Sequence, residues 1–437
     1  MKNAMEIESE PPEPGAGPSQ AQKPMYLLSP DLTGAASAKP SLGASSRPQI
    51  FYPFPPSGAA RKAFYAAHFP RTSQRDWADW RWQLKNRITS SEAISKILPL
   101  SPDEIQGITL NRSSLPLAVT PYYASLLDPE NAAQGLRRCV IPSAAESLFS
   151  PGEALDPLGE EHHSPTPGLV HRYPNRALFL VTDFCSTYCR YCTRSRGMGG
   201  AGDIGKLRHR WEKALAYIEA TPAIQDVLLS GGDALTLPDE ALEWLLARVS
   251  RIPHVEIVRI GTKIPAVLPQ RVTKGLTRML KKYHPLWMSL HFTHPAELTP
   301  EAAHACGLLA DAGIPLGSQT VLLSGVNDAS ATMKALFQGL LKMRVRPYYL
   351  YQCDPIAGSA HFRTPVSTGV EIMRALRGNV SGYAMPTYVI DAPGGGGKIP
   401  VSPDFITGRE NGDILLTNTW GGSYRYPDHD CQTGTPQ

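Results

Sequence analysis

The chain has 437 residues, enough to bury a large core in two or three domains or in one enlarged barrel. Its formal net charge is only +4, from 43 Lys and Arg against 39 Asp and Glu, so we expect neither a nucleic acid nor an anionic membrane as partner. The N-terminus is acidic and Pro-rich and no apolar run approaches the roughly 18 residues of a membrane span, which together predict a cytoplasmic protein.

The N-terminal third changes character at about residue 60. Residues 1–60 are dense in Pro, Gly, Ser and Ala and have few periodic apolar residues, which predicts a disordered tail. The following segment has a helical apolar pattern, and Ser101 and Glu104 have the spacing of a capping box at a helix start. We therefore expect a helical N-terminal region over 61–165.

After residue 165, short apolar runs alternate with amphipathic segments of helix length. The runs are 177–184, 226–233, 255–262, 286–292, 319–323 and 346–354. Strands that alternate with helices predict an α/β fold with parallel strands and crossover helices. Six strands are too few for a closed eight-unit barrel. The pattern alone leaves an open, partial barrel and a doubly wound sheet equally open for residues 166–385, followed by a C-terminal segment over 386–437.

Polar residues stand at the ends of these predicted strands. They are Cys185, Asp233, His291, His294, Gln319 and Asp354. In either architecture the carboxyl ends of parallel strands share one edge of the sheet, and loops converge there. We therefore expect these side chains around a common opening.

Three of the seven cysteines, Cys185, Cys189 and Cys192, lie within eight positions after the first strand. An odd total with a tight cluster does not resemble a disulfide framework, and in a reducing compartment it indicates a metal. Four thiolates close an iron–sulfur or structural zinc site, whereas three leave one metal position without a protein ligand. The alternatives are a zinc ion completed by a distant Cys or His, and three unrelated buried cysteines.

A second motif places Lys398 directly after four glycines, 394–397. It is not a phosphate-binding P-loop, because Ala392 stands where that motif needs Gly and Ile399 where it needs Ser or Thr. A lysine on a mobile glycine loop can form a Schiff base, as lysines that hold pyridoxal 5'-phosphate do. A flexible surface turn is an equal alternative.

Two weaker signals flank the cysteines. The glycine pair before Asp233 lets the backbone approach a ligand closely, and the Asp233 carboxylate can accept a hydrogen bond from an ammonium group. A turn of this kind is, however, more often purely structural. Arg172 and Arg176 offer paired guanidinium groups that suit a cofactor phosphate. Solvated surface arginines are the alternative.

Taken together, these motifs resemble the lysine 2,3-aminomutase family, radical S-adenosylmethionine enzymes that also use pyridoxal phosphate. The similarity covers roughly residues 70–427 and includes DWADWRWQLKNRI, LAVTPYYASLLDP, HRYPNRALFLVTDFCSTYCRYCTRSR, DVLLSGGDAL, GIPLGSQTVLL and DAPGGGGKIPV. It implies an α/β fold of the partial (β/α)6 radical S-adenosylmethionine barrel type, with an N-terminal helical region and a C-terminal extension.

The resemblance also implies cofactors and their ligands. Cys185, Cys189 and Cys192 would hold a 4Fe-4S cluster whose remaining iron binds S-adenosylmethionine, and Lys398 would hold pyridoxal 5'-phosphate. Further implied contacts are Arg172, Tyr173, Arg176 and Gln319 for pyridoxal phosphate, and Tyr191, Asp233 and His291 on the S-adenosylmethionine side. The implied substrate contacts are Arg194 for the carboxylate, and Asp354 and Asp391 for the far end of the substrate.

The implied activity is an isomerase that moves the α-amino group of a free amino acid to the β carbon. Two buried carboxylates at the far end predict a cationic guest, so we expect lysine, with arginine as the second candidate and glutamate excluded. Less favoured alternatives are modification of a protein-bound lysine and a non-catalytic iron–sulfur protein. An enzyme of this kind needs an electron donor of the flavodoxin or ferredoxin type.

The sequence departs from the family near its C-terminus. Members commonly bind zinc there with a further cysteine after GVND, but here Ala329 follows GVND and only Cys431 remains in the last segment. We expect no structural zinc, and homo-oligomer formation is left open.

Overall fold

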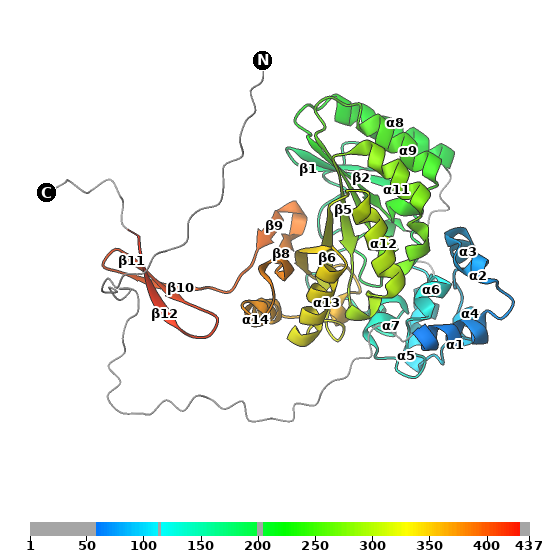
Figure 1. The fold of residues 1–437 in the computed structure, drawn as a ribbon, viewed down its shortest axis with the longest axis horizontal. Coiled ribbons are helices and arrows are strands. Elements are labelled where there is room, and N and C mark those ends of the chain that lie inside the picture. The colour runs from blue at the N-terminus through cyan, green and yellow to red at the C-terminus, as the bar shows by residue number, and fades with distance from the viewer. Residues whose placement is uncertain (1–57, 112–114, 199–203, 429–437) are drawn as a thin grey trace, which may run out of the picture. The chain divides into compact units, whose positions relative to one another are not determined.

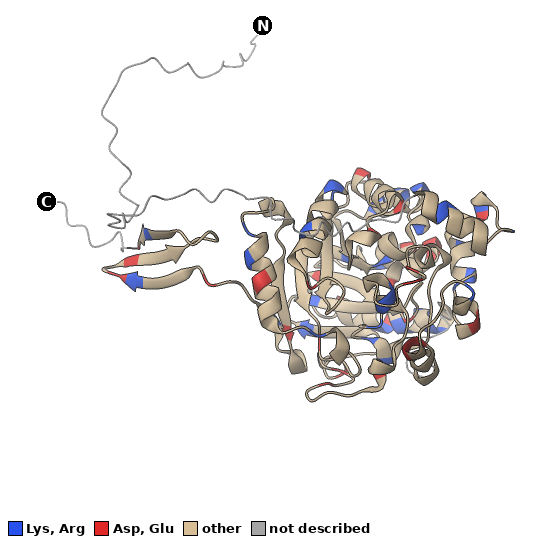
Figure 2. Ribbon diagram, turned by 90° about the horizontal axis from the view of Figure 1, so that it is seen from below, with Lys and Arg blue, Asp and Glu red and all other residues tan. Residues whose placement is uncertain are grey.

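The computed structural model describes residues 58–111, 115–198 and 204–428, and these form two compact units, 58–403 and 404–428. The predicted disordered tail lies outside the described residues except for 58–60, which begin helix α1. No described helix is long and apolar enough to cross a membrane. Acidic and basic residues are interspersed over the described helices and strands (Figure 2).

The larger unit begins with short helices. They are α1 (Gly58–His68), α2 (Gln74–Trp77), α3 (Trp80–Lys85), α4 (Ser91–Ser95), α5 (Pro102–Leu110), α6 (Pro121–Ala124) and α7 (Gly135–Val140). The predicted capping box starts α5: the Glu104 amide donates to Ser101 Oγ at 3.3 Å, and the Ser101 amide donates to Glu104 Oε2 at 2.8 Å. Glu104 also pairs with the buried Arg137 of α7 at 2.7 Å, which joins these two helices.

A nine-stranded sheet follows, with its strands in chain order. The strands are β1 (Leu169–Tyr173), β2 (Arg176–Thr182), β3 (Asp226–Gly231), β4 (Ile257–Thr262), β5 (Leu286–His291), β6 (Leu316–Leu322), β7 (Arg346–Gln352), β8 (Thr387–Ala392) and β9 (Gly397–Pro400). Strands β2 to β8 are parallel, and β1 and β9 are antiparallel edges. The six predicted strands are confirmed as β2 to β7.

The strand order decides between the two predicted architectures. A doubly wound sheet reverses its strand order at a switch point, whereas this order runs once through the chain and leaves two edges, as in an open, curled half-barrel. The parallel sheet also gains β8, which the sequence prediction had left in the C-terminal segment after residue 385. That strand was missed because its apolar stretch is short and merges into the glycine loop.

Helices connect the parallel strands. They are α8 (Ile204–Glu219), α9 (Asp239–Val249), α10 (Ile264–Val267), α11 (Lys274–Leu280), α12 (Pro300–Asp311), α13 (Ser330–Lys342) and α14 (Val366–Leu376). Figure 1 shows α8, α9, α11 and α12 side by side along the sheet, and consecutive members of this row are in contact. The indole of Trp211 in α8 stacks on that of Trp244 in α9, with ring centroids 6.0 Å apart.

Side-chain alternation along the strands separates a helix-facing surface from an open one. In β3, Val227 and Leu229 are fully buried, while Leu228 and Ser230 are only partly buried and line a cavity. Strand β6 alternates in the same way, and Gln319 lies on its cavity side. Because side chains of a strand point alternately to opposite faces, every second residue is presented to the concave side of the sheet.

The smaller unit is a three-stranded antiparallel sheet of β10 (Ile406–Glu410), β11 (Asp413–Thr417) and β12 (Ser423–Pro427). Strands β10 and β11 are joined through Asn411 and Gly412, which have φ of 52° and 87°. Two successive residues with positive φ favour a tight hairpin, and Asn and Gly tolerate that conformation best. These strands were not predicted from the sequence.

Candidate active site

A cavity of about 380 Å³ in the larger unit brings together the predicted site residues with the exception of His294. Those in its lining are Arg172, Tyr173, Arg176, Cys185, Cys189, Tyr191, Cys192, Arg194, Asp233, His291, Gln319, Asp354, Asp391 and Lys398. His294 does not line it. Its Nδ1 instead accepts from the Ala296 amide at 3.2 Å, so His294 caps the short helix that follows β5.

The three clustered cysteines lie in the loop after β2 as free thiols at the cavity wall. Burial raises the pKa of all three, that of Cys192 to about 11, so these thiols stay protonated unless a metal binds them. The loop is anchored from outside: Arg87 Nη1 donates to the Cys185 carbonyl at 2.7 Å, and the buried Arg190 pairs with Glu146 at 2.5 Å.

The donor chemistry of this loop fits an iron–sulfur cluster. Within the described residues, no three Cys, His, Asp or Glu side chains are grouped to hold one metal ion, and this includes the three cysteines. In a cluster each thiolate binds an iron of its own, and three thiols spread along one loop suit that arrangement. We therefore retain the cluster interpretation for Cys185, Cys189 and Cys192.

A buried polar network lies beside the cysteines. The Tyr191 hydroxyl is 2.8 Å from His291 Nε2 and 2.8 Å from Thr293 Oγ1, and Lys263 Nζ is 2.8 Å from Glu297. Burial and the charge of Lys263 lower the pKa of His291 well below its ordinary value, so its imidazole is neutral. Lys263 and Glu297 were not predicted from the sequence. Lys263 follows β4 directly, and this position at the carboxyl end of a strand could have indicated a site residue.

The Asp233 carboxylate accepts hydrogen bonds within the protein that were not predicted from the sequence. Its carboxylate accepts from the Thr262 hydroxyl at 2.6 Å, from the Lys263 amide at 2.7 Å and from the Leu235 amide at 3.1 Å. Burial raises its pKa to about 6. The side chain thus joins the ends of β3 and β4, and its contact with a cofactor ammonium stays a prediction.

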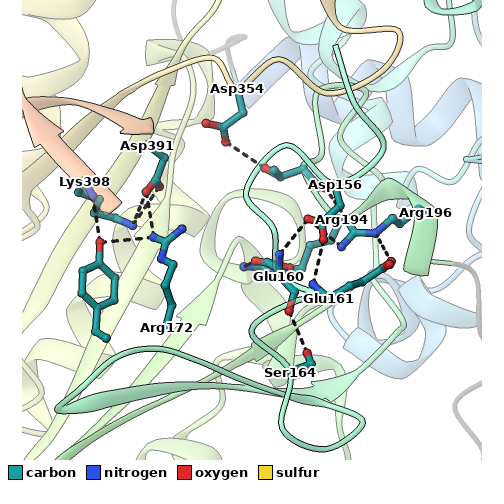
Figure 3. Close-up of polar contacts among 12 residues, drawn as sticks. Asp156, Glu160, Glu161, Ser164, Arg172, Arg194, Arg196, Asp354, Asp391 and Lys398 are labelled. Carbon is teal, nitrogen blue, oxygen red and sulfur yellow. Dashed lines mark hydrogen bonds and ion pairs between the residues drawn. The ribbon is translucent and has the colours of Figure 1, made fainter. Parts of the chain in front are cut away.

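Lys398 and Asp391 face each other because β8 and β9 pair in the register Asp391 to Lys398. Lys398 Nζ is 3.0 Å from Asp391 Oδ2, and Arg172 Nη2 is 3.1 Å from Oδ1 of the same carboxylate (Figure 3). The Lys398 amide donates to the Tyr173 hydroxyl at 2.9 Å. Asp391 therefore already has two cationic partners, which the sequence analysis did not foresee.

The glycine loop before Lys398 is a packed turn. Gly394, Gly395 and Gly397 have φ of 69°, 90° and 89°, a region that favours glycine. A Cβ on Gly395 would come within 2.4 Å of His163 Nε2, and the Gly394 amide donates to the Pro157 carbonyl at 2.8 Å. These glycines are required by backbone conformation and close packing, whereas the sequence analysis had attributed them to loop mobility.

The wall around Lys398 has donors and aromatic surface that fit pyridoxal phosphate. The Arg176 guanidinium lies over the Tyr173 ring at 4.6 Å, and Lys398 Nζ is 5.4 Å from the centroid of the Tyr351 ring. Gln319 Nε2 is 3.4 Å from the Tyr351 hydroxyl. Guanidinium groups suit a phosphate, and the phenol rings suit a flat heterocycle. The Lys398 amine therefore lies near groups that could bind both the phosphate and the ring of such a cofactor.

Arg194 and Asp354 occupy another part of the wall. Arg194 donates from Nε and Nη2 to Glu160 at 2.7 to 3.1 Å, a pair that the sequence analysis missed. Asp354 accepts from Thr193 Oγ1 at 3.3 Å. Burial and the neighbouring Asp391 raise the pKa of Asp354 to about 7.

Comparison with known proteins identifies the family. Residues 373–436 match the family model described as "Lysine-2,3-aminomutase", and residues 179–336 match that of the radical SAM superfamily. The L-lysine 2,3-aminomutase of Clostridium subterminale is 53% identical over 81% of this chain and 85% of its own. The chain belongs to the lysine 2,3-aminomutase family.

Other relatives differ in the amino acid that they are named for. The L-lysine 2,3-aminomutase of Bacillus subtilis is 47% identical over 81% of this chain and 75% of its own. The glutamate 2,3-aminomutase of Clostridioides difficile is 44% identical over 80% of this chain and 82% of its own. Membership of this aminomutase family makes the chain an isomerase and implies a 4Fe-4S cluster, S-adenosylmethionine and pyridoxal phosphate as its cofactors.

Proposed function

We propose that the chain is an L-lysine 2,3-aminomutase, which moves the α-amino group of free L-lysine to the β carbon and forms β-lysine. The observation that supports lysine as the substrate is that Asp354 is shielded from solvent without an ion pair among the described residues. It lies in the cavity wall and is largely shielded from solvent, yet within the described part of the chain it has a hydroxyl partner and no ion pair. Relatives named for lysine support the same choice.

A buried carboxylate without a cation is costly, and a substrate ammonium can offset that cost. Lysine carries such a group at its far end, whereas the side-chain carboxylate of glutamate would meet the like charge of Asp354. The fold distinguishes the two carboxylates. Asp391 keeps Arg172 as a partner when Lys398 holds the cofactor, whereas Asp354 has no ion pair among the described residues and therefore supplies the negative charge for the substrate ammonium.

Arginine is the second candidate substrate. Asp354 and Asp391 both line the cavity, and the charge of Asp391 contributes to the raised pKa of Asp354. A guanidinium presents several donors in one plane and suits more than one carboxylate at a time. A direct comparison of substrates separates the two candidates.

We assign the cofactor contacts as follows. Cys185, Cys189 and Cys192 would hold the cluster, with Tyr191, Asp233 and His291 on the S-adenosylmethionine side, and Lys398 would hold pyridoxal phosphate together with Arg172, Tyr173, Arg176 and Gln319. When bound, the cluster and S-adenosylmethionine supply the radical that removes and returns a substrate hydrogen, and pyridoxal phosphate carries the migrating nitrogen.

The chain's own residues position and shield the substrate. Arg194 would bind the carboxylate at one end and Asp354 the ammonium at the other, which places the carbons between them near Lys398. Asp391 Oδ2 lies 3.0 Å from Lys398 Nζ, within reach to accept a proton from that amine when the amine reacts as a nucleophile. Side chains of the parallel strands line this space and cover one side of the substrate.

An anaerobic turnover assay with lysine, arginine, ornithine and glutamate tests the proposal. We expect lysine to dominate, and Asp354→Asn to lower kcat/KM for lysine by about 10²- to 10³-fold, because the ammonium loses a buried partner. Glu161→Gln, at an exposed carboxylate outside the cavity lining, is the matched control and should change little. Preferred turnover of glutamate would contradict the proposal, and preferred turnover of arginine would change the substrate but keep the role of Asp354.

The pKa of Asp354 predicts a pH dependence of substrate binding. A cation binds the ionised carboxylate, and below about 7 that group must first lose its proton. The KM for lysine should therefore fall as the pH rises towards 7, by about tenfold per pH unit, and level off above it. Asp354→Asn should remove this dependence, and a pH profile of KM that is unchanged in this variant would show that another group is responsible.

A further inference from the structure

An acidic segment before β1 touches both halves of the candidate site. We call residues 156–161 the acidic strap. Arg196 pairs with Asp156 at 3.0 Å and with Glu161 at 2.9 Å, and Arg194 pairs with Glu160 (Figure 3). The Pro157 carbonyl of the same strap accepts from the glycine loop that carries Lys398. The strap thus links the arginines after the cysteine loop to the lysine loop.

Glu160 is held firmly within this strap. Its amide donates to Asp156 Oδ1 at 3.0 Å, and its carbonyl accepts from Ser164 Oγ at 3.0 Å. Its side chain is only 10% exposed and lines the cavity. Glu161 is different, since its side chain is 76% exposed and pairs with Arg196 away from the cavity lining.

The Glu160 contacts use one edge of the Arg194 guanidinium. Arg194 Nε is 3.1 and 3.0 Å from the two Glu160 oxygens, and Nη2 is 2.7 Å from Oε1. Because the guanidinium is planar and has five donors, the edge with Nη1 and the second Nη2 hydrogen is still available for a carboxylate. Within the described residues, no hydrogen bond from Nη1 occupies that edge.

We propose that Glu160 is a positioning residue that fixes the plane of Arg194, so that its Nη1 edge receives the substrate carboxylate. This inference rests on the proposed function, which gives Arg194 the substrate carboxylate as its partner. Fixing a guanidinium in advance reduces the side-chain freedom that is lost when the substrate binds. The opposite arrangement, in which Glu160 occupies the carboxylate position until the substrate displaces it, makes a different prediction for the same variant.

The test is equilibrium binding by calorimetry to the protein reconstituted with cluster and pyridoxal phosphate, without S-adenosylmethionine so that no turnover occurs. The two probes are lysine and 1,5-diaminopentane, which is lysine without its carboxylate. Glu160→Gln should weaken lysine binding by about 10-fold or more, the scale of a hydrogen bond to a charged group, and leave diamine binding within about 2-fold. Glu161→Gln is the matched control and should alter neither.

A double-mutant cycle with Arg194→Ala gives a second, independent readout. If Glu160 acts through Arg194, Glu160→Gln should have no further effect on lysine binding once Arg194 is removed. Additive losses would overturn the proposal. Equal weakening of lysine binding and diamine binding would also overturn it, because that result indicates a packing role for Glu160. Tighter lysine binding by Glu160→Gln would overturn it as well, because it indicates that the substrate carboxylate must displace Glu160.

A turnover assay of the unmodified protein distinguishes failure of the proposed function from failure of the role proposed for Glu160. If lysine is not converted but another amino acid is, the proposed substrate is wrong. The same cycle is then run with the converted amino acid and the amine that it yields on decarboxylation, for example arginine and agmatine. The role of Glu160 depends on the shared α-carboxylate and is decided by that pair.

Discussion

Replacing any one of Cys185, Cys189 and Cys192 with alanine should abolish the reconstituted 4Fe-4S cluster and, with it, reductive cleavage of S-adenosylmethionine. Each substitution removes one of only three proposed protein ligands, and an iron without its thiolate is exposed to loss from the cluster. Visible absorbance, iron content and methionine release from S-adenosylmethionine measure the effect. We expect a complete loss in all three variants.

Cys306→Ala and Cys353→Ala are the matched controls for this experiment. Both thiols are buried, whereas the three site cysteines are partly exposed, and neither control thiol lines the cavity. These variants should keep the cluster even if they lose some packing stability. A Cys185, Cys189 or Cys192 variant with a full cluster spectrum and normal cleavage would refute the ligand assignment.

Lys398→Ala should lose covalent attachment of pyridoxal phosphate and all detectable aminomutase turnover, while it retains the cluster. The cysteines and Lys398 lie on different elements of the same cavity, the loop after β2 and strand β9, so the two attachments have no residue in common. Borohydride reduction followed by peptide mapping identifies the modified lysine in the unmodified protein, and iron content follows the cluster.

A surface lysine provides the control for that result. Lys282 pairs with Glu243 and its side chain is 60% exposed, so Lys282→Ala should leave pyridoxal phosphate content unchanged. Recovery of the reduced cofactor on a lysine other than Lys398 would show that the glycine loop has another purpose. Loss of the cluster together with the cofactor in Lys398→Ala would show that the two sites are coupled.

The sequence alone determined the elements that depend on local pattern. Strands β2 to β7 and their crossover helices were readable because buried parallel strands are short apolar runs and the helices have their own period. The capping box at Ser101 was readable because its two hydrogen bonds join residues three positions apart. The cysteine loop and Lys398 were conspicuous because their chemistry is concentrated in short motifs.

Only the tertiary structure decided which charged groups are already satisfied. Asp391 pairs with Arg172 from the far edge of the sheet, 219 positions away in the chain, and Glu160 pairs with Arg194 across 34 positions. The sequence analysis therefore treated Asp354 and Asp391 alike, although in the fold only Asp354 lacks an ion pair among the described residues. Coulomb energies depend on distances of a few ångströms between side chains, and those distances come from strand order and register, which no local pattern of residues specifies.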